Sequence, residues 1–514
     1  MATEDRFAPI VRDTGRRRWN NWHGSIPRDE QPLAALLDIW NGDPNRSDID
    51  FYKGTTRGLQ GLIHRAMRED KVIRGLGGGW SFSSVAAATQ GLLLNTRPLN
   101  YRFANIALHP GFQGDGSNVF FVQCGISIAE LNEYLRHRGK ALKTSGASNG
   151  QTIAGAISTG THGSAIDFGA IPDFVVGLHV IVAPDRHVWI ERATQPIVDD
   201  GLIDYLGAEI IRDDAIFDAA RVCFGSFGII HGVLIETEDL YYLHASRRRM
   251  PLDAGLWAAI DRLDFSAVQL PGPGGARPYH FSVLFNPHHL PDRPYITAMY
   301  KSTSPPENCE PPSPARITPG DNALEVIGAL TDRLGEISIA VIAQLVDQVY
   351  PEYNAICGTL GEIFTDTATR GTAASVGMGI PLGEVQKAVD LALKVNDEYA
   401  FSGLLALRYV KASEATLAFT RYRDHTCILE FDGPLSRQTR TYFNRVWRQF
   451  DAEGIPYTFH WGKINDLNAQ RVLDMYGRAP VEAWSATRQT LLTTPELRRV
   501  FSNPFLRQVG LDGG

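Results

Sequence analysis

Two stretches of small residues restrict the fold of this chain more than any other feature of its sequence. The first, residues 72–83, leads from a β-branched segment into four glycines and two serines. The second, residues 145–164, begins about 65 residues later and has almost no side chain large enough to fill a core. Because glycine has no Cβ, its N–H can approach an anion directly. Together the tracts predict an extended anionic cofactor laid across backbone, and the alternative is a pair of tight turns.

Neither tract matches the common nucleotide-binding or catalytic motifs. In the first, G-x-G-x-x-G starting at Gly75 would require glycine at Trp80, which argues against the nicotinamide fingerprint. In the second, residues 146–150 match the G-x-S-x-G nucleophile elbow, which needs a strand before it and a helix after it. We expect the reverse here, a helix before and a Gly/Ser/Thr-rich loop after. A hydrolase is therefore disfavoured, and no Walker A lysine or H-E-x-x-H motif supports a kinase or a zinc hydrolase.

Length and composition predict a globular protein of several domains. At 514 residues the chain exceeds what one hydrophobic core usually supports, so we expect two or three domains. The net charge of −7 argues against nucleic acid as the main partner, and no apolar window is long enough for a membrane span. The five cysteines are scattered, odd in number and never arranged as C-x-x-C, which favours reduced thiols and a cytoplasmic location.

Hydrophobic periodicity predicts an α+β fold. Residues 120–124 predict a strand that leads into a helix, with Ser127 and Glu130 at the spacing of a capping box. Residues 174–182 alternate between apolar and other residues, which predicts a half-buried strand that pairs with residues 187–191. We expect later helices over residues 324–334 and 382–398 and later strands over residues 404–411 and 425–431. This alternation indicates a sheet covered by helices on one face.

Several charged residues in the second half each allow two interpretations. Arg408 and Glu430 lie within apolar strand patterns and either face solvent or line a pocket. A segment near the C-terminus contains His460, Trp461 and Lys463. If it is extended, Trp461 and Lys463 share one face and His460 points to the other. From the residues alone, the simplest interpretation of this segment is a strand end with one exposed lysine.

Four motifs occur in a fixed order along the chain: GGGWSFS at residues 77–83, QTIAGAISTGTHG at 151–163, FGSFGII at 224–230 and HWGK at 460–463. Together they closely resemble the motifs of the vanillyl-alcohol-oxidase-type (PCMH-type) flavoproteins. Within that group the chain is similar to the sugar-lactone and alditol oxidases, of the D-arabinono-1,4-lactone oxidase and L-gulonolactone oxidase kind. The resemblance covers nearly the whole chain, from Trp19 to Phe505.

This resemblance implies a domain organisation and a cofactor. Residues 1–245 would form a two-subdomain FAD-binding domain, residues 446–514 would return to complete it, and residues 246–445 would form a substrate cap with a mixed sheet covered by helices. No metal is implied. The residues implied in FAD binding are Gly75, Leu76, Gly77, Gly78, Gly79, Trp80, Ser81, Phe82, Ser145, Gly146, Ala147, Gln151, Thr152, Gly155, Ala156, Ser158, Thr159, Gly160, Thr161, His162, Gly163, Gly228, Ile229, Ile230 and Lys463.

The resemblance also implies an activity and the residues that carry it. Lys463 would lie near the pyrimidine side of the flavin and stabilise the negative charge that develops as hydride arrives at N5. Arg408 falls where these oxidases bind substrate, and His460 is a further candidate for proton transfer. The implied reaction is oxidation of a CH–OH group of a sugar, sugar lactone or polyol-like metabolite, with oxygen or a carrier as electron acceptor.

The sequence departs from the family pattern at two positions. Trp80 stands where many members have a histidine bonded to the flavin, so we expect non-covalent FAD with Trp80 packed against the ring edge. Ala406 stands where the alditol oxidases have glutamate, so a polyol hydroxyl would lose a partner. Two alternatives stay open. Ala406 and the unusual loop over residues 304–314 favour a same-fold enzyme for a natural-product or apolar alcohol, and Trp80 allows a flavin-binding protein without turnover.

Overall fold

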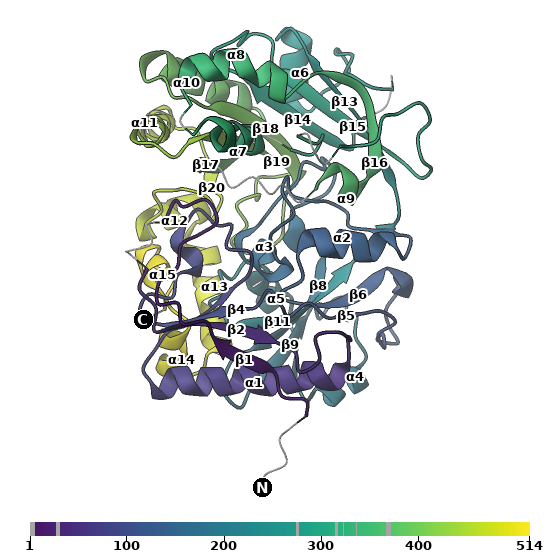
Figure 1. Ribbon diagram of the computed structural model, residues 1–514, viewed down its shortest axis with the longest axis vertical. Helices are drawn as coiled ribbons and strands as arrows, with labels where there is room; N and C mark the ends of the chain where they lie inside the picture. The colour runs from purple at the N-terminus through teal and green to yellow at the C-terminus, as the bar shows by residue number, and fades with distance from the viewer. Residues whose placement is uncertain are drawn as a thin grey trace.

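The computed structural model (Figure 1) describes residues 6–26, 31–273, 277–313, 317–321, 323–335, 337–365 and 372–513. Helices and three large sheets make up the fold, which confirms the predicted α+β class. Sheets of four and six strands lie in the lower half of Figure 1, and a sheet of eight strands lies in the upper half.

The four-stranded sheet carries the first glycine-rich tract at the end of one strand. Its strands in spatial order are β1 (Ile10–Asp13), β2 (Ala35–Trp40), β4 (Leu92–Asn95) and β3 (Ile73–Leu76). β2, β4 and β3 are parallel, and β1 adds an antiparallel edge. Helix α1 (Ile49–Arg68) links β2 to β3 along the bottom of the molecule (Figure 1). The glycine tract leaves the carboxyl end of β3, the edge at which open α/β sheets bind their ligands.

The six-stranded sheet holds the strand pair that the sequence predicts. Its strands in spatial order are β10 (Glu209–Arg212), β9 (His187–Glu191), β8 (Val175–Ile181), β11 (Ile229–Glu236), β6 (Val119–Gln123) and β5 (Arg102–Phe103). β8 pairs with β9 as predicted, but it is almost wholly buried rather than half-buried, because Gly177 and His179 on its second face are also covered. The predicted helix is α2 (Ile128–Arg136), and Ser127 and Glu130 form its capping box.

Shorter elements connect the strands of the lower half. They are η2 (Ser84–Ala86), η3 (Gly116–Asn118), β7 (Lys140–Ala141), α3 (Ile153–Thr159), η4 (Ile171–Phe174), α4 (Asp200–Leu206), α5 (Asp214–Arg221) and β12 (Glu238–Asp239). β7 and β12 pair with each other as a small two-stranded sheet. Two of these elements, η2 and α3, follow directly on the two glycine-rich tracts.

The eight-stranded sheet confirms both strands predicted in the second half of the chain, as β18 and β19. Its strands in spatial order are β16 (Tyr353–Thr359), β13 (Tyr242–Arg249), β15 (Tyr295–Ser302), β14 (His280–Phe285), β18 (Leu404–Lys411), β19 (His425–Pro434), β17 (Ala373–Pro381) and β20 (Thr458–Phe459). Neighbouring strands pair antiparallel, and a parallel bridge between Glu310 and Ile356 lies at the edge. The helices of this half are α6 (Ala254–Arg262), α7 (Ala323–Leu334), α8 (Ile339–Val349), α9 (Leu360–Ile363), α10 (Val385–Glu398) and α11 (Arg437–Glu453).

Helices cover both faces of this sheet, and the expectation of one covered face was wrong. α7 and α8 pack with Leu404 and Ala406 on one face. α10 and α11 pack with Leu405 and Leu407 on the other. The cause is visible in β18, where every residue before Lys411 is buried, because a strand that is apolar on both faces needs cover on both.

The last segment of the chain returns from the upper half to the lower half. After β20 its helices are α12 (Ala469–Tyr476), α13 (Arg478–Leu491), α14 (Pro495–Val500) and α15 (Pro504–Gln508) (Figure 1). Trp484 Nε1 donates a hydrogen bond to the carbonyl of Val222 over 2.9 Å, and Asn503 Nδ2 donates to the carbonyl of Val85 over 2.9 Å. The C-terminal helices are therefore fixed to η2, which follows the first glycine tract, and to the segment that follows α5.

The expectation of five reduced thiols was wrong for one pair of cysteines. Cys309 and Cys357, 48 residues apart, form a disulfide, whereas Cys124, Cys223 and Cys427 are free and buried. Because disulfides persist in oxidising compartments, the cysteines no longer favour the cytoplasm. Cys309 lies in the loop over residues 304–314, whose last residue, Pro314, falls outside the described residues.

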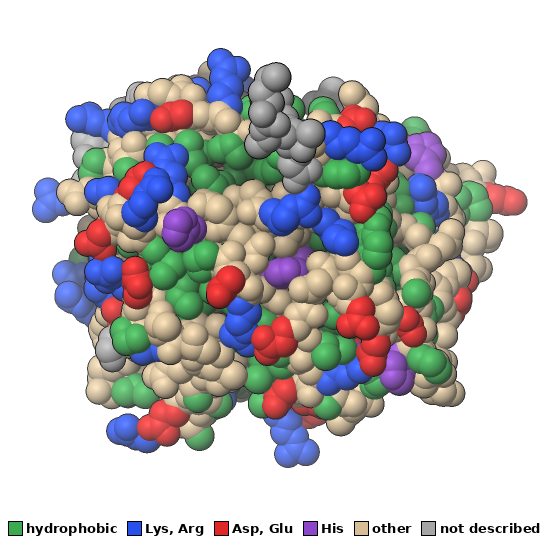
Figure 2. All heavy atoms as spheres, turned by 90° about the horizontal axis from the view of Figure 1, so that it is seen from below, with side chains coloured by type: hydrophobic (Ala, Val, Ile, Leu, Met, Phe, Trp, Pro, Cys, Tyr) green, Lys and Arg blue, Asp and Glu red, His purple; other side chains and the backbone are tan. Residues whose placement is uncertain are grey.

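The surface carries charges of both signs. Figure 2 shows Lys and Arg side chains interspersed with Asp and Glu over the face seen from below, without a continuous region of one sign. Phosphate backbones bind to clustered positive charge, and that face offers no such cluster. Among the described residues, no helix combines the length and the apolar character needed to cross a membrane.

A network of buried polar side chains lies in the lower half. Tyr52 Oη is 2.6 Å from His179 Nδ1, and His179 Nε2 is 2.8 Å from His187 Nδ1. His231 Nε2 accepts a hydrogen bond from Gln123 Nε2 over 2.9 Å. Because burial disfavours a charged imidazole, the pKa of His179 lies well below its ordinary value and the pKa of His231 is lowered to about 3. Both rings are therefore neutral in the folded chain.

We expect acid to destabilise the protein through these histidines. The unfolded chain binds protons near pH 6.5 and the folded chain resists them, so the free energy of unfolding falls as the pH drops below 6.5. The contribution of His231 alone should lower the free energy of unfolding by about 2 kcal/mol between pH 7 and pH 5. Urea unfolding at both pH values measures this loss. The loss in free energy of unfolding should be about 2 kcal/mol smaller in His231→Gln. It should be unchanged in His137→Gln, because His137 is exposed. Equal losses in the wild type and both variants would contradict the role of His231.

Candidate active site

A large cleft brings the two glycine-rich tracts together with charged residues of the eight-stranded sheet. It encloses about 1450 Å³ including its open mouth. Both tracts, residues 228–230, Arg408, His460 and Lys463 all line it. The residues that the sequence singles out, although far apart along the chain, therefore share one cleft.

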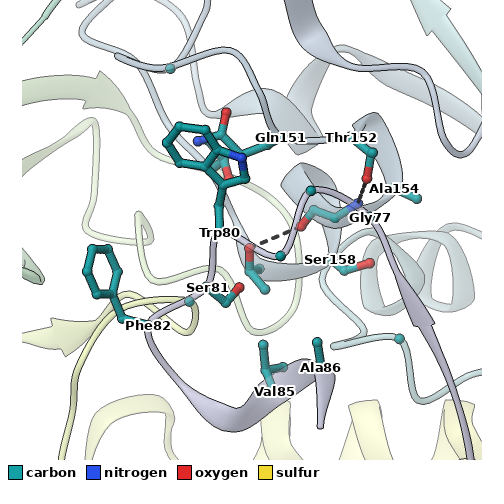
Figure 3. Close-up of a pocket in the computed structure, with 18 of the residues that line it drawn as sticks. Gly77, Trp80, Ser81, Phe82, Val85, Ala86, Gln151, Thr152, Ala154 and Ser158 are labelled. Carbon is teal, nitrogen blue, oxygen red and sulfur yellow. Dashed lines mark hydrogen bonds between the residues drawn. The ribbon is translucent and has the colours of Figure 1, made fainter. Parts of the chain in front are cut away.

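The first tract forms the loop between β3 and η2, and its glycines allow close contact with the second tract. A Cβ at Gly77 would lie 2.0 Å from Thr152 Oγ1, so only glycine permits this approach. Gly79 has a φ of +72°, in the left-handed region that favours glycine. Figure 3 shows Gly77 beside Thr152, with Ser81 and Phe82 further along the loop. The loop thus presents bare backbone to the cleft.

Trp80 is part of the wall of the cleft and is held by aromatic neighbours. Its ring stacks on Trp22 with the ring centroids 4.9 Å apart and the planes 13° apart. The ring of His23 meets it edge-on, with the centroids 5.6 Å apart. Trp19 and His23 also line the cleft, so the N-terminal segment contributes to the site. This packing fixes the orientation of the indole that replaces the expected histidine.

The second tract contains a helix where the sequence predicted a loop. Thr152 caps α3 by accepting a hydrogen bond from the N–H of Gly155, and Gly160 ends it in the left-handed conformation. Ile153 and Ile157 are fully buried and anchor the helix in the core. The tract was predicted to be a loop because so few of its side chains are large. A helix of seven residues, however, needs only one apolar face. Gly155, Ser158 and Thr159 of the tract then line the cleft.

Four of the residues implied in FAD binding do not line the cleft. Ser145 Oγ donates a hydrogen bond to Asn149 Oδ1 in the interior. Ala156 belongs to the buried core, and Gly160 supplies the end of α3. Gly163 packs so closely against Thr144 that a Cβ would lie 2.3 Å from its Oγ1. These four residues support the second tract without lining the cleft, and the other residues implied in FAD binding line it.

A cluster of charged side chains lies where the cleft reaches the eight-stranded sheet. Lys463 Nζ donates a hydrogen bond to Glu430 Oε1. Arg408 Nε lies 3.6 Å from Glu430 Oε2, and His162 Nε2 lies 3.8 Å from Glu430 Oε1. Burial alone would favour a neutral Glu430, but the adjacent Lys463 and Arg408 cations outweigh it and hold the pKa of Glu430 below its ordinary value. The cluster is therefore one buried carboxylate shared by two cations.

The two histidines of this region are neutral and have opposite tautomers. Burial lowers the pKa of His162 to about 4 and places the pKa of His460 well below its ordinary value. His162 Nδ1 lies 3.0 Å from the carbonyl of Gly163 and must carry the proton, which leaves the lone pair on Nε2. His460 Nδ1 accepts the N–H of Gly462 over 3.0 Å. Only His162 therefore keeps an acceptor nitrogen for a ligand hydroxyl.

The segment over residues 460–463 is a turn, and the alternation expected for an extended strand was wrong. The N–H of Lys463 donates to the carbonyl of His460 over 3.1 Å. This turn brings both His460 and Lys463 to the cleft. Trp461 points away instead, donating from Nε1 to the carbonyl of Leu417 over 2.7 Å and stacking on Tyr476. Lys463 is thus a residue of the site and not an exposed lysine.

Comparison with known proteins supports the cofactor and the fold expected from the sequence. An FAD binding domain matches residues 51–190. The chain is 26% identical to a D-arabinono-1,4-lactone oxidase of Yarrowia lipolytica over 42% of this chain and 38% of that protein. It is 23% identical to an L-gulono-1,4-lactone dehydrogenase of Mycobacterium tuberculosis over 93% of this chain and 99% of that protein. A crystal structure of cholesterol oxidase from B. sterolicum matches 98% of this chain and 97% of its own with a TM-score of 0.69, at 13% identity.

The chain therefore contains an FAD-binding domain and has the predicted PCMH-type fold. The cleft of this flavoprotein fits the cofactor in two respects. Its length is lined by glycine backbone and by hydroxyls such as those of Ser158 and Thr159, which suit a pyrophosphate and a ribityl chain. Gln151 Oε1 is buried beside the cleft and has no hydrogen-bond partner among the described residues, so it can accept a bond from a bound molecule.

Sequence reasoning missed several residues of this flavoprotein's cleft. Glu430 was noticed only as a charge in an apolar strand, yet it lies directly opposite Ala406 in the register of β18 and β19. It therefore supplies a carboxylate next to the position where the expected glutamate is absent. Arg74 was missed although it is a charge inside β3; it donates to the carbonyls of Gly225 and Phe501 and ties three segments together.

Proposed function

We propose that this protein uses bound FAD to oxidise a CH–OH group of a sugar lactone or polyol-like metabolite. The observation that carries the proposal is the cluster of Lys463, Glu430, Arg408 and His162 at one end of the cleft. Buried charges and a neutral imidazole suit a substrate with several hydroxyl groups better than an apolar alcohol. The relatives named D-arabinono-1,4-lactone oxidase and L-gulono-1,4-lactone dehydrogenase support the same substrate class.

We assign residues 1–245 and 446–514 to FAD binding and residues 246–445 to the substrate cap. In this assignment the first tract holds the pyrophosphate, the second runs toward the flavin ring and residues 228–230 meet the adenosine end. Bound FAD supplies the acceptor for the hydride that leaves the substrate carbon. Trp80, whose indole nitrogen is a poor nucleophile, leaves the flavin non-covalently bound. The end of the cleft with Lys463 and Arg408 then receives the substrate.

The side chains of the cluster have distinct tasks in this reaction. His162 Nε2 accepts the hydrogen bond of the reacting hydroxyl and takes its proton as the carbonyl forms, which leaves the carbon free to release its hydrogen as hydride. Lys463 would place a positive charge beside the bound cofactor and so favour its acceptance of hydride. Arg408 anchors the substrate. His460 uses its lone pair for Gly462 and positions the turn that carries Lys463, so we no longer propose it for proton transfer.

The mode of FAD attachment is the first expected outcome. Acid precipitation of the purified yellow protein should release the whole flavin absorbance band into the supernatant, because no histidine occupies position 80. The visible spectra of supernatant and pellet measure this. A yellow pellet would show a covalent bond at another residue, and a colourless protein that takes up no added FAD would contradict the assignment of FAD as the cofactor.

The substrate class can be tested by mixing the holoenzyme with alcohols in the absence of oxygen. We expect L-gulono-1,4-lactone, D-arabinono-1,4-lactone or an alditol such as xylitol to bleach the flavin band, because each offers several hydroxyls to the charged cluster. Bleaching by an apolar alcohol alone would replace this proposal with the natural-product alternative. No bleaching by any of them would favour a flavin-binding protein without turnover. Admitting air or an artificial carrier afterwards identifies the electron acceptor.

Lys463→Met should slow flavin bleaching roughly 100-fold while FAD stays bound, because a preorganised charge at the reacting centre contributes about this much. Stopped-flow absorbance measures the rate, and the flavin-to-protein ratio measures cofactor content. Lys411→Met at the exposed end of β18 is the matched control and should bleach at the wild-type rate. Lys463→Arg, which keeps the charge beside Glu430, should recover part of the rate. An unchanged rate in Lys463→Met would remove its assigned role.

A further inference from the structure

Three side chains with metal-binding atoms meet at the edge of the eight-stranded sheet where β16 lies (Figure 1). They are His244 of β13, Cys357 of β16 and Cys309 of the loop over residues 304–314. One ligand atom of each lies within 4.8 Å of the other two. None of the three lines the cleft, so this group is separate from the candidate active site. Histidine nitrogen and cysteine sulfur are the usual ligands of zinc.

The register of two neighbouring strands places the histidine beside one of the cysteines. His244 lies directly opposite Cys357 where β13 pairs with β16, so both side chains project from the same face of the sheet. The Nδ1 atom of His244 is buried and has no hydrogen-bond partner among the described residues. A neutral imidazole with its lone pair on Nδ1 donates that pair to a metal ion. The ring therefore has a ligand atom available beside Cys357.

The loop that carries Cys309 is held next to β16 by backbone contacts as well as by the disulfide. The N–H of Cys357 donates to the carbonyl of Glu310 over 2.9 Å, and the N–H of Glu310 donates to the carbonyl of Ala355 over 3.1 Å. These hydrogen bonds form a parallel bridge that does not depend on the sulfur atoms. Reduction of the disulfide therefore leaves both cysteine side chains close to each other and to His244.

The spacing of the two cysteines suits a tetrahedral zinc ion once the disulfide is open. Zinc binds thiolates at about 2.3 Å, so two cysteine sulfurs on one ion lie roughly 3.8 Å apart. The Cα atoms of Cys309 and Cys357 are 5.5 Å apart, which lets rotation of the side chains reach that separation without movement of the backbone. The negative charges of the two thiolates cancel the charge of Zn²⁺, so the half-buried group acquires no net charge. Soft thiolate ligands also favour zinc over magnesium and calcium.

We propose that the reduced protein binds a zinc ion through Cys309, Cys357 and His244. A thiol reductant first opens the disulfide by transferring two electrons and two protons, and is itself oxidised to a disulfide. Zn²⁺ then displaces both thiol protons and takes the lone pair of the imidazole. Among the described residues, no fourth His, Cys, Asp or Glu joins the group, so water completes the tetrahedron. Disulfide and zinc are thus alternative links between the loop and β16, and the redox conditions decide which one forms.

The test titrates Zn²⁺ into holoenzyme that has been reduced with a phosphine under nitrogen and then freed of the reductant. The reduced wild type should bind one zinc ion per chain and release about two protons, which calorimetry and a pH indicator measure. Co²⁺ in place of zinc should give the d–d absorption of a four-coordinate site, at longer wavelengths than the flavin bands. The oxidised protein is the matched control, because it keeps the thiols of Cys124, Cys223 and Cys427. It should give neither the zinc stoichiometry nor the cobalt spectrum.

Variants of the reduced protein locate the site. His244→Gln and Cys309→Ser should each weaken zinc binding roughly 100-fold or more, because each removes one of the three protein ligands. His137→Gln, a change at an exposed position, should bind zinc as the wild type does. His244→Gln should still form the disulfide on oxidation, which shows that the loop and β16 keep their places in that variant. In the wild type, bound zinc should protect Cys309 and Cys357 from alkylation by iodoacetamide, as peptide mass spectrometry measures.

Each contrary outcome overturns the proposal. It fails if the phosphine does not open the disulfide, if the reduced protein binds no stoichiometric zinc, or if the oxidised protein binds zinc as tightly as the reduced one. Equal zinc affinity in the wild type and His244→Gln would show that the thiolates bind without the histidine, and the three-ligand site would be wrong. Bleaching of the flavin by lactones has no bearing on these measurements, so this inference and the proposed function succeed or fail separately.

Discussion

A single buried carboxylate determines how four distant segments of this flavoprotein meet. Glu430 in the middle of β19 bonds Lys463 on the turn after β20, and Arg408 of β18 and His162 beyond α3 approach the same group. Removing these charges from water costs several kcal/mol per ion, so the fold tolerates them only while they stay together. The turn at residues 460–463 is consequently fixed to the upper sheet, although the helices that follow it belong to the lower half. The FAD-binding part of the cleft and its proposed substrate end therefore meet at this turn.

The features that the sequence predicted correctly depend on neighbours in the chain. The capping box of α2 and the pairing of β8 with β9 follow from residues fewer than twenty positions apart, where spacing alone specifies the geometry. The strands β18 and β19 were predicted because a short continuous run of apolar residues is typical of a buried strand. The two glycine tracts were expected to serve one ligand, and Gly77 against Thr152 shows how directly they meet. The family resemblance then supplied the name of the cofactor, which spacing could not.

The features that sequence reasoning missed depend on contacts between distant residues. The disulfide joins Cys309 to Cys357 because β16 lies beside the loop that contains Cys309. No local spacing in the sequence predicts such a pairing. The partnership of Glu430 with Ala406 depends on the register of two strands, which a one-residue shift would change completely. The turn at His460 was misjudged because period-two alternation was applied to a strand that had already ended at Phe459. In each case the tertiary structure decided between alternatives that the residues themselves left open.

The return of the C-terminal segment has a consequence for the order in which the protein is made. Arg74 of β3 donates to the carbonyl of Phe501, and Asn503 donates to the carbonyl of Val85, so residues more than four hundred positions later complete the wall of the cleft. Domains fold in the order in which the ribosome releases them. The earliest strands of this protein must therefore wait, with their glycine loop uncovered, until more than four hundred further residues have been synthesised. Flavin can be enclosed only after the chain has been synthesised beyond Asn503.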